Sequence, residues 1–382
     1  MSVIFSVNGK FSAFDYCKHL NNSVKKLHLI TTYPFFHVKK YGLLKSQVTS
    51  FFFIELIKRI NQKIFLDNGY YKVGNFLENI TNQLFDNLAS KKVKQLNYKN
   101  LIAFSGSAKK TLLVSKRLSM KTILIRGSSH ILEVKKILSN ENKKNKIRSN
   151  YPYKSLIKNE IQEYKNADKI ILHSSFAINS FLKRNYSKEK ILMLPLGITK
   201  NLNLKKKYKK KKIILYLGQV TARKGVHYLI KAFIKLKKKD YELHIAGPIL
   251  NDIKHILNKV NSNKNILVYG RVTENKKNEL FKKASIFCLP TLEDGFAKVI
   301  LEALEYRNFL LCSEYSAGPD IIKKYKKGLI VNPRNLSQFS NQIKKSINFS
   351  KKNNINNFNL RELNSFYNWK NINKKLLSFL DI

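Results

Sequence analysis

Short apolar runs recur along the chain, and longer stretches with helical spacing separate them. Many runs are apolar at consecutive positions, which is typical of strands buried on both faces of a parallel sheet. The predicted strands are Val3–Val7, Leu27–Thr31, Leu101–Phe104, Thr122–Ile125, Lys169–His173, Ile191–Leu194, Ile213–Leu217, Glu242–Ala246, Ile266–Tyr269, Ile286–Leu289, Phe309–Cys312 and Leu329–Val331. Between them, patterns such as Val226–Lys237 and Glu274–Ala284 predict helices. Because strand and helix alternate twice over, we expect an α/β fold with two doubly wound, Rossmann-like domains.

The length and a basic run place the domain boundary. A chain of 382 residues suits two domains. After Gly197 the sequence reads ITKNLNLKKKYKKKK, and such a run of like charge resists burial and predicts a linker, although it would also suit membrane phosphates. The expected divisions are an N-terminal domain over 1–196, a C-terminal domain over 197–361 and a helix within 362–382, with polar loops over 139–152 and 341–361.

The charge balance indicates an anionic partner. Lys and Arg number 73 against 24 Asp and Glu, a net charge of +49. Nucleic acid, an acidic membrane surface and phosphorylated substrates would all suit that charge. Compositional drift toward Lys, Asn and Ile on solvated faces explains it equally well. Because proteins that read a nucleic-acid groove prefer Arg and this chain is poor in Arg, we expect no specific nucleic-acid partner.

Cysteine usage and the apolar runs indicate a compartment. Cys17, Cys288 and Cys312 have neither metal nor redox spacing, and their odd number suits no disulfide framework, which favours a reducing environment. The first residues, MSVIFSVNGK, lack the basic start of a signal peptide. The longest apolar runs, such as 51–54, fall far short of the roughly 20 residues that span a bilayer. We expect a cytoplasmic protein, with peripheral docking on the inner face of the membrane as the alternative.

The acidic loop (Leu289–Glu302) reads LPTLEDGFAKVILE and follows a predicted strand. Gly295 would let the backbone approach a ligand closely, and the free N–H groups where the next helix begins favour an anion. Glu302 could accept hydrogen bonds from a sugar diol. The alternative is structural: Glu293 and Asp294 cap the helix, and Glu302 is a surface acid.

The cationic loop (Tyr216–Gly225) reads YLGQVTARKG. A strand ends before Gly218, which makes the turn, and Arg223 and Lys224 follow at the carboxyl end of that strand. Ligands of open α/β sheets bind at this edge, and paired cations there suit a diphosphate. The alternative is that both are ordinary surface cations. The sequence contains neither a Walker loop nor GxGxxG.

Taken together, the two loops and their spacing resemble the retaining family 4 glycosyltransferases of the GT-B fold. The resemblance covers nearly the whole chain and is strongest from Tyr216 to Pro333. There the sequence reads YLGQVTARKGVHYLIKAF, then ELHIAGP, then GRVTENKKNELFKKASIFCLPTLEDGFAKVILEAL, then SAGPDII and GLIVNP.

The resemblance implies roles for the two loops. Arg223 and Lys224 would grip the donor diphosphate, Glu302 would hold the ribose hydroxyls, and Asp294 would face the transferred sugar. The further donor-binding residues that it implies are Gly9, Gly218, Glu293, Gly295, Phe296, Ala297 and Lys298.

The N-terminal half resembles one branch of that family more loosely. Asn8-Gly9-Lys10 would open toward the cleft, and RGSSH at 126–130 resembles that branch's RGSTH segment. NEIQEYKNADKIILHSSF at 159–176 resembles its E-x-x-EY-x-x-AD helix. His130, at a strand end where a helix begins, would contact the transferred sugar or the acceptor. A lone histidine is more often structural.

Three positions depart from the family pattern. Asp294 stands where Glu is usual, Ala297 replaces the usual Gly, and residues 307–309 (RNF) replace a small Gly-Pro step. The last two changes leave room for altered donor choice or lost activity.

The resemblance implies sugar transfer from a nucleotide-sugar donor, with retained configuration, to a hydroxyl of a polysaccharide, lipopolysaccharide or lipid-linked acceptor. The N-terminal domain would hold the acceptor, the C-terminal domain the donor, and the last helix would return to the N-terminal domain. No DxD pair follows a strand and no His/Cys cluster has metal spacing, so we expect neither a metal nor another cofactor. The alternatives are a non-catalytic relative that binds sugar nucleotides and a basic nucleic-acid-binding protein.

Overall fold

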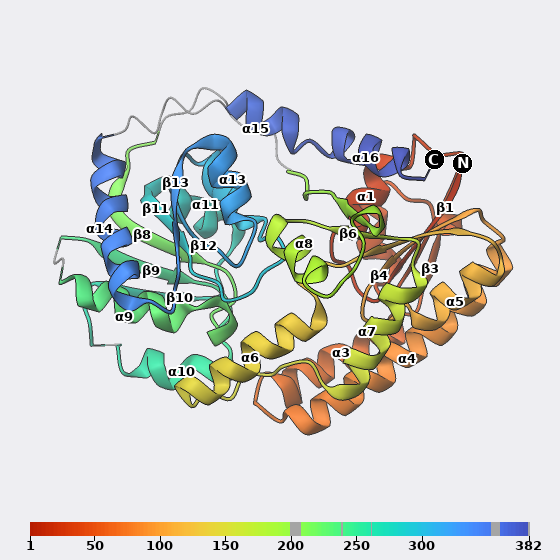
Figure 1. The fold of residues 1–382 in the computed structure, drawn as a ribbon, viewed down its shortest axis with the longest axis horizontal. Helices are drawn as coiled ribbons and strands as arrows, with labels where there is room; N and C mark the ends of the chain where they lie inside the picture. Colours follow the sequence, from red (N-terminus) through yellow and green to blue (C-terminus); the bar gives the residue numbers. More distant parts are fainter. Residues whose placement is uncertain (199–207, 238–239, 261, 353–359, 381–382) are drawn as a thin grey trace.

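The protein, for which we use a computed structural model, is described over residues 1–198, 208–237, 240–260, 262–352 and 360–380. Figure 1 shows two α/β domains side by side, each a twisted sheet with helices on both faces. Every strand pairing within the two sheets is parallel. The predicted pair of doubly wound, Rossmann-like domains is therefore confirmed: this is the GT-B architecture.

The N-terminal sheet has the strand order β3-β2-β1-β4-β5-β6-β7, so the order reverses between β1 and β4. Its strands are β1 (Ser2–Val7), β2 (Lys26–Thr31), β3 (Val48–Ser50), β4 (Asn100–Phe104), β5 (Lys121–Ile125), β6 (Lys169–Leu172) and β7 (Ile191–Met193). Its helices are α1 (Ala13–Leu20), α2 (Phe35–Lys39), α3 (Phe52–Asn61), α4 (Tyr71–Leu96), α5 (Lys109–Arg117), α6 (Ile131–Asn145), α7 (Lys154–Asn166) and α8 (Ser175–Leu182), with short 3-10 turns η1 (Lys45–Gln47) and η3 (Lys188–Lys190) and a π-helical turn η2 (Gln62–Leu66). The sequence pattern missed only β3 among these strands, because its three residues (VTS) include a single apolar one, whereas the equally short β7 (ILM) is apolar throughout.

The C-terminal sheet has the order β10-β9-β8-β11-β12-β13 and reverses between β8 and β11. Its strands are β8 (Lys211–Leu217), β9 (Glu242–Ala246), β10 (Ile266–Gly270), β11 (Ala284–Leu289), β12 (Phe309–Ser313) and β13 (Gly328–Val331). Beside it lie the 3-10 turn η4 (Ala222–Lys224) and the helices α9 (Val226–Leu236), α10 (Asn251–Asn258), α11 (Glu274–Lys283), α12 (Val299–Glu305), α13 (Gly318–Tyr325) and α14 (Leu336–Lys352). The chain ends in α15 (Leu360–Phe366) and in α16 (Trp369–Ser378), which packs on the N-terminal domain. Each strand predicted in this half is present.

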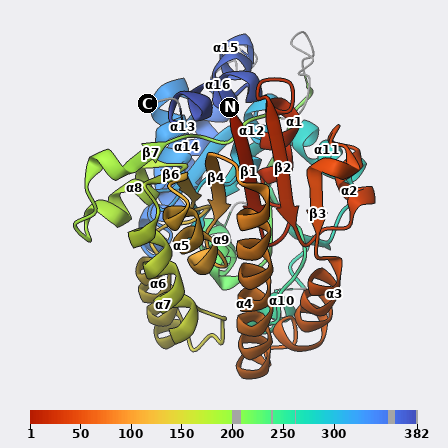
Figure 2. The same cartoon turned by 90° about the vertical axis from the view of Figure 1, so that its right-hand side faces the viewer.

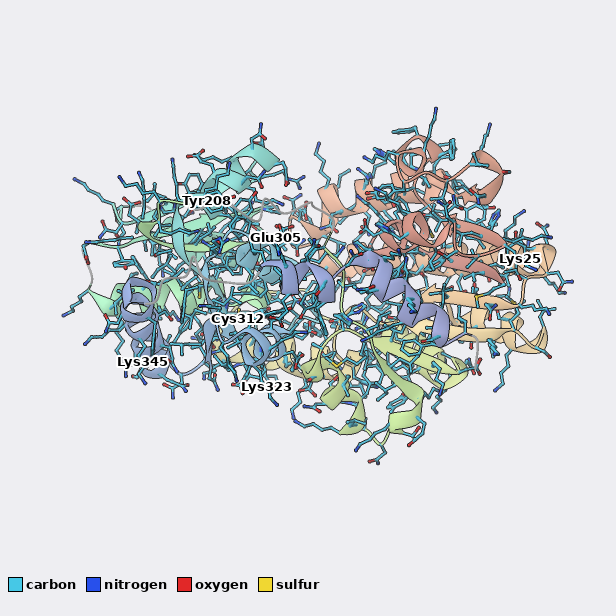
Figure 3. All side chains as sticks on the ribbon, turned by 90° about the horizontal axis from the view of Figure 1, so that it is seen from above. Lys25, Tyr208, Glu305, Cys312, Lys323 and Lys345 are labelled. Atoms are coloured by element: carbon cyan, nitrogen blue, oxygen red, sulfur yellow. The ribbon has the colours of Figure 1, made fainter. Side chains whose placement is uncertain are left out.

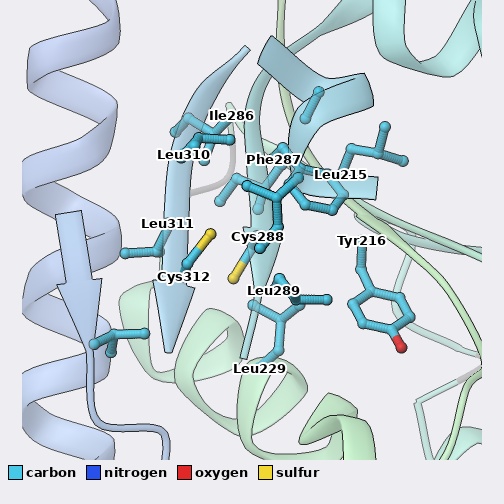
Figure 4. Packing of buried hydrophobic residues seen from close by; sticks show 14 of the residues in the cluster. Leu215, Tyr216, Leu229, Ile286, Phe287, Cys288, Leu289, Leu310, Leu311 and Cys312 are labelled. Atoms are coloured by element: carbon cyan, nitrogen blue, oxygen red, sulfur yellow. The ribbon is translucent and has the colours of Figure 1, made fainter. Parts of the chain in front are cut away.

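The core of the C-terminal domain lies between its sheet and the helices beside it. Figure 4 shows Leu215 and Tyr216 of β8 beside Phe287 and Cys288 of β11. Cys288 and Cys312 are free and buried in this core. Burial raises the pKa of both thiols, so both residues serve packing.

The chain crosses between the domains twice, and the two crossings lie together. The backbone N–H of Ile198 donates to the carbonyl oxygen of Tyr367 over 2.8 Å, and Ile198 forms a parallel bridge with Asn368. Beyond Asn368, α16 packs on α1 of the N-terminal domain. Gly197 allows this approach, since a Cβ there would lie 2.5 Å from the ring of Trp369. Figure 2 shows α15 and α16 at one end of the molecule and α3, α4 and α10 at the other.

Two predicted loops are partly helical, and the predicted terminal helix is divided. Helix α6 runs through the first half of 139–152 because its residues Ile137 and Leu138 pack in the C-terminal core. Helix α14 likewise continues to Lys352, while 353–359 and most of the basic run, 199–207, lie outside the described residues. Two helices, α15 and α16, occupy 360–378, and Asn368 caps the second.

Charge is spread widely over the surface. Figure 3 shows Lys25, Lys323 and Lys345 on separate parts of the molecule, and all three are exposed. This distribution agrees with the drift explanation for part of the +49 charge. Across the described residues, no helix is long and apolar enough to cross a membrane.

Candidate functional site

A cavity of about 670 Å³ lies between the domains, where both sheets reverse their strand order. Loops that follow β1 and β4 line it from one side, and loops that follow β8 and β11 line it from the other. Ligands of open α/β sheets bind at such reversals, so two binding edges face each other here. The lining includes Phe11, Ser12, Ser105, Arg126, Gly127, Ser128, Glu160, Arg223, Asp294, Phe296, Ala297 and Lys298.

The cationic loop and the acidic loop interlock beside this cavity. The carbonyl oxygen of Arg223 accepts from the backbone N–H of Leu292 over 2.8 Å. Gly225, with a φ of 69°, lies so close to Pro290 that a Cβ would come within 1.9 Å of its carbonyl oxygen. The structure thus brings together two loops that are some 70 residues apart along the chain.

Each cation of the first loop pairs with an acid of the second. An Nη of Arg223 lies 2.5 Å from a carboxylate oxygen of Glu293, and Lys224 pairs with Asp294. The Glu293 carboxylate is fully buried and also accepts from the Ser128 hydroxyl (2.6 Å) and the Ser129 backbone N–H (2.9 Å). Burial alone would raise the pKa of Glu293, but Arg223 and these hydrogen bonds outweigh it and lower the pKa to about 2. The carboxylate is therefore ionised and joins the two domains.

Gly295 allows the closest approach across the cleft. A Cβ on this residue would lie 2.2 Å from the carbonyl oxygen of Gly127, on the opposite domain. We predicted close approach to a ligand at Gly295, whereas in this structure its neighbour is the backbone of Gly127 and Ser128. The glycine therefore permits domain closure.

Lys298 forms a second bridge between the domains. Its ammonium lies 3.2 Å from a carboxylate oxygen of Asp15 on α1 and 5.0 Å from the centre of the Trp369 ring. Phe296 beside it is buried and contacts Tyr367 and His173. The acidic loop thus contacts α1 as well as the segment around the second crossing.

Both positions where the family's glycine is replaced have a left-handed backbone. Ala297 has a φ of 59° and Arg307 has a φ of 58°. Only glycine adopts this region without steric cost, and other residues lose about 1–2 kcal/mol there. Arg307 follows Tyr306, the C-cap residue of α12, at a position where glycine commonly ends a helix.

Ala297→Gly is expected to raise the free energy of unfolding by about 0.5 kcal/mol. Glycine removes a steric cost of about 1–2 kcal/mol at this left-handed position. It also makes the unfolded chain more flexible, which lowers stability by only about 0.4–1 kcal/mol. Urea unfolding measures the change. The matched control, Ala303→Gly inside α12, should lower the free energy by about 1 kcal/mol or more. Equal destabilisation by both variants would contradict the strain at residue 297.

Several of the predicted residues, Glu302 among them, lie outside the lining of the cavity. Glu302 stands in the first turn of α12, and its carboxylate lies 3.1 Å from the ammonium of Lys277 on α11. Among the described residues, neither Glu302 nor Lys224, Gly218 and Gly9 belongs to the lining of the cavity. Gly218 has a φ of 154° and follows β8 directly. Gly9 follows β1, and the ammonium of Lys58 binds the neighbouring Asn8.

His130 lies behind the cavity wall. Its Nδ1 accepts from the backbone N–H of Leu132 at the start of α6, and its ring packs against Tyr164, Phe181 and Tyr186. Burial, followed by the charges of Arg184 and Arg126, lowers the pKa of His130 to about 3. In this structure His130 caps α6 within an aromatic cluster, and its contact with the transferred sugar or the acceptor stays a prediction.

His130 should make stability depend on pH. Because its folded pKa of about 3 lies below the unfolded value of about 6.5, the unfolded state binds the proton first. The contribution of His130 to the free energy of unfolding is complete above pH 6.5. It decreases by about 1.4 kcal/mol per pH unit as the pH falls toward 3. His130→Asn keeps a cap acceptor without titrating, so its free energy of unfolding should fall less steeply between pH 6.5 and 4.5. Urea titrations at each pH measure both slopes, and equal slopes would contradict the assignment.

Sequence reasoning assigned no role to Arg126 or Glu160 on the N-terminal side of the cavity. Arg126 and Glu160 both line the cavity and form a buried ion pair of 3.0 Å. Burial raises the pKa of Glu160, and Arg126 acts in the opposite direction. The only sequence signal was their position in the RGSSH and ExxEY segments. Within the described ranges, no group of His, Cys, Asp or Glu side chains is arranged to hold a metal ion.

Comparison with known proteins gives consistent family matches for the second half. Residues 198–359 match the family model of Glycosyl transferases group 1. An uncharacterized glycosyltransferase of Methanocaldococcus jannaschii is 25% identical over 173 residues, which cover 44% of each chain. A GalNAc-α-(1→4)-GalNAc-α-(1→3)-diNAcBac-PP-undecaprenol α-1,4-N-acetyl-D-galactosaminyltransferase of Campylobacter jejuni is 26% identical over 40% of this chain and 43% of its own. The chain thus matches less than half the length of these curated relatives.

The whole fold is matched by solved structures. The crystal structure of Anabaena HepE in complex with UDP has a TM-score of 0.68, with 13% identity, and covers 100% of both chains. At this identity the likeness establishes the fold alone. The region 198–359 is therefore a Glycosyl transferases group 1 domain, within a chain that has the GT-B fold throughout.

Proposed function

We propose that the protein is a glycosyltransferase that moves a sugar from a nucleotide-sugar donor to an acceptor hydroxyl, with retained configuration and without a metal. The observation that carries this proposal is the pair of cations at the strand-order reversal, held against two carboxylates beside an interdomain cavity. The chain's similarity to the Campylobacter transferase and to HepE bound to UDP supports it.

The two cations and two carboxylates of the interlocked loops would exchange some of their partners when a donor binds. In the structure the two cations and two carboxylates neutralise each other. Because a diphosphate competes for Lys224, its binding would release the carboxylate of Asp294 toward the transferred sugar. Glu293 is buried and held by two serines as well as Arg223, so it would stay in place. Glu302, in the first turn of α12, would accept the ribose hydroxyls.

The transfer needs no protein nucleophile. The bond between the anomeric carbon and the diphosphate oxygen breaks, the acceptor oxygen bonds to the same face of that carbon, and the leaving oxygen takes the acceptor's proton. Arg223 and Lys224 would stabilise the charge that develops on the diphosphate. Closure across Gly295 would exclude water from the cavity. The acceptor would be a polysaccharide, lipopolysaccharide or lipid-linked saccharide on the N-terminal side.

A thermal-shift panel of nucleotide sugars tests the proposal. A ligand that binds only the folded state raises the unfolding midpoint, so the donor base and sugar are identified together. Glu302→Ala should abolish the shift given by the best donor, and Glu274→Ala, which removes the other carboxylate paired with Lys277, is the control. No shift with any nucleotide sugar would overturn the proposal. Donor binding without turnover across many acceptors would instead favour a non-catalytic relative.

Turnover should persist in excess EDTA. The proposed mechanism neutralises the diphosphate with Arg223, Lys224 and the N–H groups at the helix start rather than with a metal, so chelation should change the transfer rate less than about twofold. Product formation with and without EDTA measures this, and restoration of lost activity by Mg²⁺ or Mn²⁺ would show that the metal-free mechanism is wrong.

A further inference from the structure

The hairpin formed by α3, η2 and α4 presents apolar side chains to the solvent, where a surface helix usually presents polar ones. Phe52, Leu56 and Ile60 follow one another at four-residue spacing on α3, and all three are exposed. Val73, Phe76 and Ile80 on α4, spaced by three and four residues, are also exposed, and the exposed fraction of Phe76 is 64%. We call these six residues the apolar face. A helix on the surface of a water-soluble domain normally presents its polar residues outward instead.

Three polar side chains of α3, those of Glu55, Lys58 and Asn61, make hydrogen bonds on the inner side of the helix. The carboxylate of Glu55 accepts from the Thr32 hydroxyl over 2.8 Å, and the Lys58 ammonium donates to the carbonyl oxygen of Asn8 over 2.8 Å. The side chain of Asn61 donates to the carbonyl oxygen of Gly74 over 2.8 Å, which ties α3 to α4. These hydrogen bonds hold the inner side of α3 against the domain, while its apolar residues face outward.

The charges around the apolar face are cationic. Between residues 52 and 80 the exposed charged side chains are Arg59, Lys63 and Lys72. Each acid of this segment is buried or half-buried. Apolar side chains flanked by cations match the interface of a bilayer with anionic headgroups. A soluble protein partner would not require this combination.

The apolar face also borders the cavity. Asn75 and Glu78 line the cavity from the same two turns of α4 that carry Val73, Phe76 and Ile80. Lys58, on the inner side of α3, holds the loop after β1, which leads into the cavity wall at Phe11 and Ser12. Figure 2 places α3 and α4 together at the end of the molecule farthest from the two chain crossings.

We propose that the apolar face inserts into an anionic lipid bilayer and that the acceptor is a lipid-linked saccharide, whose polar part enters the cavity from that surface. The choice of acceptor rests on the function proposed above, whereas the insertion does not. A membrane-bound acceptor needs a cavity whose rim lies at the lipid surface, and the position of α4 provides one.

Vesicle binding tests the insertion. The full chain should bind vesicles of phosphatidylglycerol and phosphatidylcholine at least about 10-fold more tightly than vesicles of phosphatidylcholine alone. Ile60→Ser should weaken binding about 5-fold. Ile234→Ser, on α9 of the other domain, removes an equally exposed isoleucine (46% against 47%) and should change binding less than about twofold. The triple variant Phe52→Ser/Leu56→Ser/Phe76→Ser should weaken binding at least about 30-fold.

A polarity-sensitive dye locates the contact. The three native cysteines are buried, so Ile60→Cys and Ile234→Cys can each be labelled selectively. Vesicles should shift the emission of the dye to the blue at position 60 and leave it unchanged at position 234. Equal shifts, or a vesicle affinity that the triple variant retains, would overturn the insertion. A shift at position 60 that grows with protein concentration without vesicles would also overturn it, because a second copy would then cover the face.

The two proposals can fail separately. The triple variant keeps the donor site, so it should keep the thermal shift with the nucleotide sugar while it loses vesicle binding. Vesicle binding without any nucleotide-sugar shift would refute the function and leave the insertion standing. A donor shift together with equal vesicle binding by the triple variant and the unaltered chain would refute the insertion alone.

Discussion

Arg223→Ala should lower kcat/KM for sugar transfer about 10³-fold, the larger of the two main effects that we expect. The guanidinium would stabilise charge on the leaving diphosphate, and removal of one such donor typically costs 10²–10³-fold. It also pairs with the buried Glu293, so that carboxylate loses its cation in the same variant. Steady-state kinetics with the donor found in the thermal-shift panel measures the effect.

Stability must be separated from catalysis in this variant. Because the Arg223 side chain is 37% exposed, solvent screens the pair, and its loss should cost about 2 kcal/mol of unfolding free energy, less than a fully buried pair. Arg334→Ala is the matched control, since Arg334 lies 3.4 Å from another buried carboxylate, Glu141, outside the cavity lining. It should lower stability by a similar amount and kcat/KM less than about threefold. A similar loss of kcat/KM in both variants would show that Arg223 acts on stability and not on catalysis.

Gly295→Ala should lower kcat about 10²-fold while the affinity for the nucleotide changes less than about threefold. The added Cβ would lie 2.2 Å from the carbonyl oxygen of Gly127, and backbone cannot yield as a side chain can. The domains must then stay apart, and a misplacement of about 1 Å at the reacting atoms can cost 10²-fold. Nucleotide binding uses one domain and should survive.

Small-angle scattering reports closure directly. Gly295→Ala should have a larger radius of gyration than the unaltered chain, both with and without nucleotide. Gly127→Ala adds its methyl group on the other side of the same contact, where nothing lies within 4 Å, and should keep the compact form. A compact Gly295→Ala variant with full activity would show that this contact does not limit closure.

The sequence predicted the sheets well because they are buried. Parallel strands covered on both faces consist of consecutive apolar residues, so every predicted strand is present and only the three-residue β3 was missed. The two site loops were predicted for a related reason, since a doubly wound sheet brings the ends of β8 and β11 together.

What the sequence could not predict depends on contacts between the domains. Helix α6 looked polar after Ser139, but Glu141 is buried by its contact with His227 of the other domain. The bridges from Glu293 to Ser128 and from Lys298 to Asp15 join residues more than 150 positions apart, and no local pattern records them. The apolar face escaped notice because spacing alone does not tell which side of an amphipathic helix points outward.

Within the described residues the two crossings meet at Ile198 and Asn368, so an opening of the domains would pivot there. Since the two segments are hydrogen-bonded to each other, the domains can rotate about this place but cannot slide past one another without breaking the bridge. The displacement during opening would increase with distance from this pivot. It would be largest at the end where α4 and α10 lie, so the proposed acceptor rim would travel farther than the loops that hold the charged side chains.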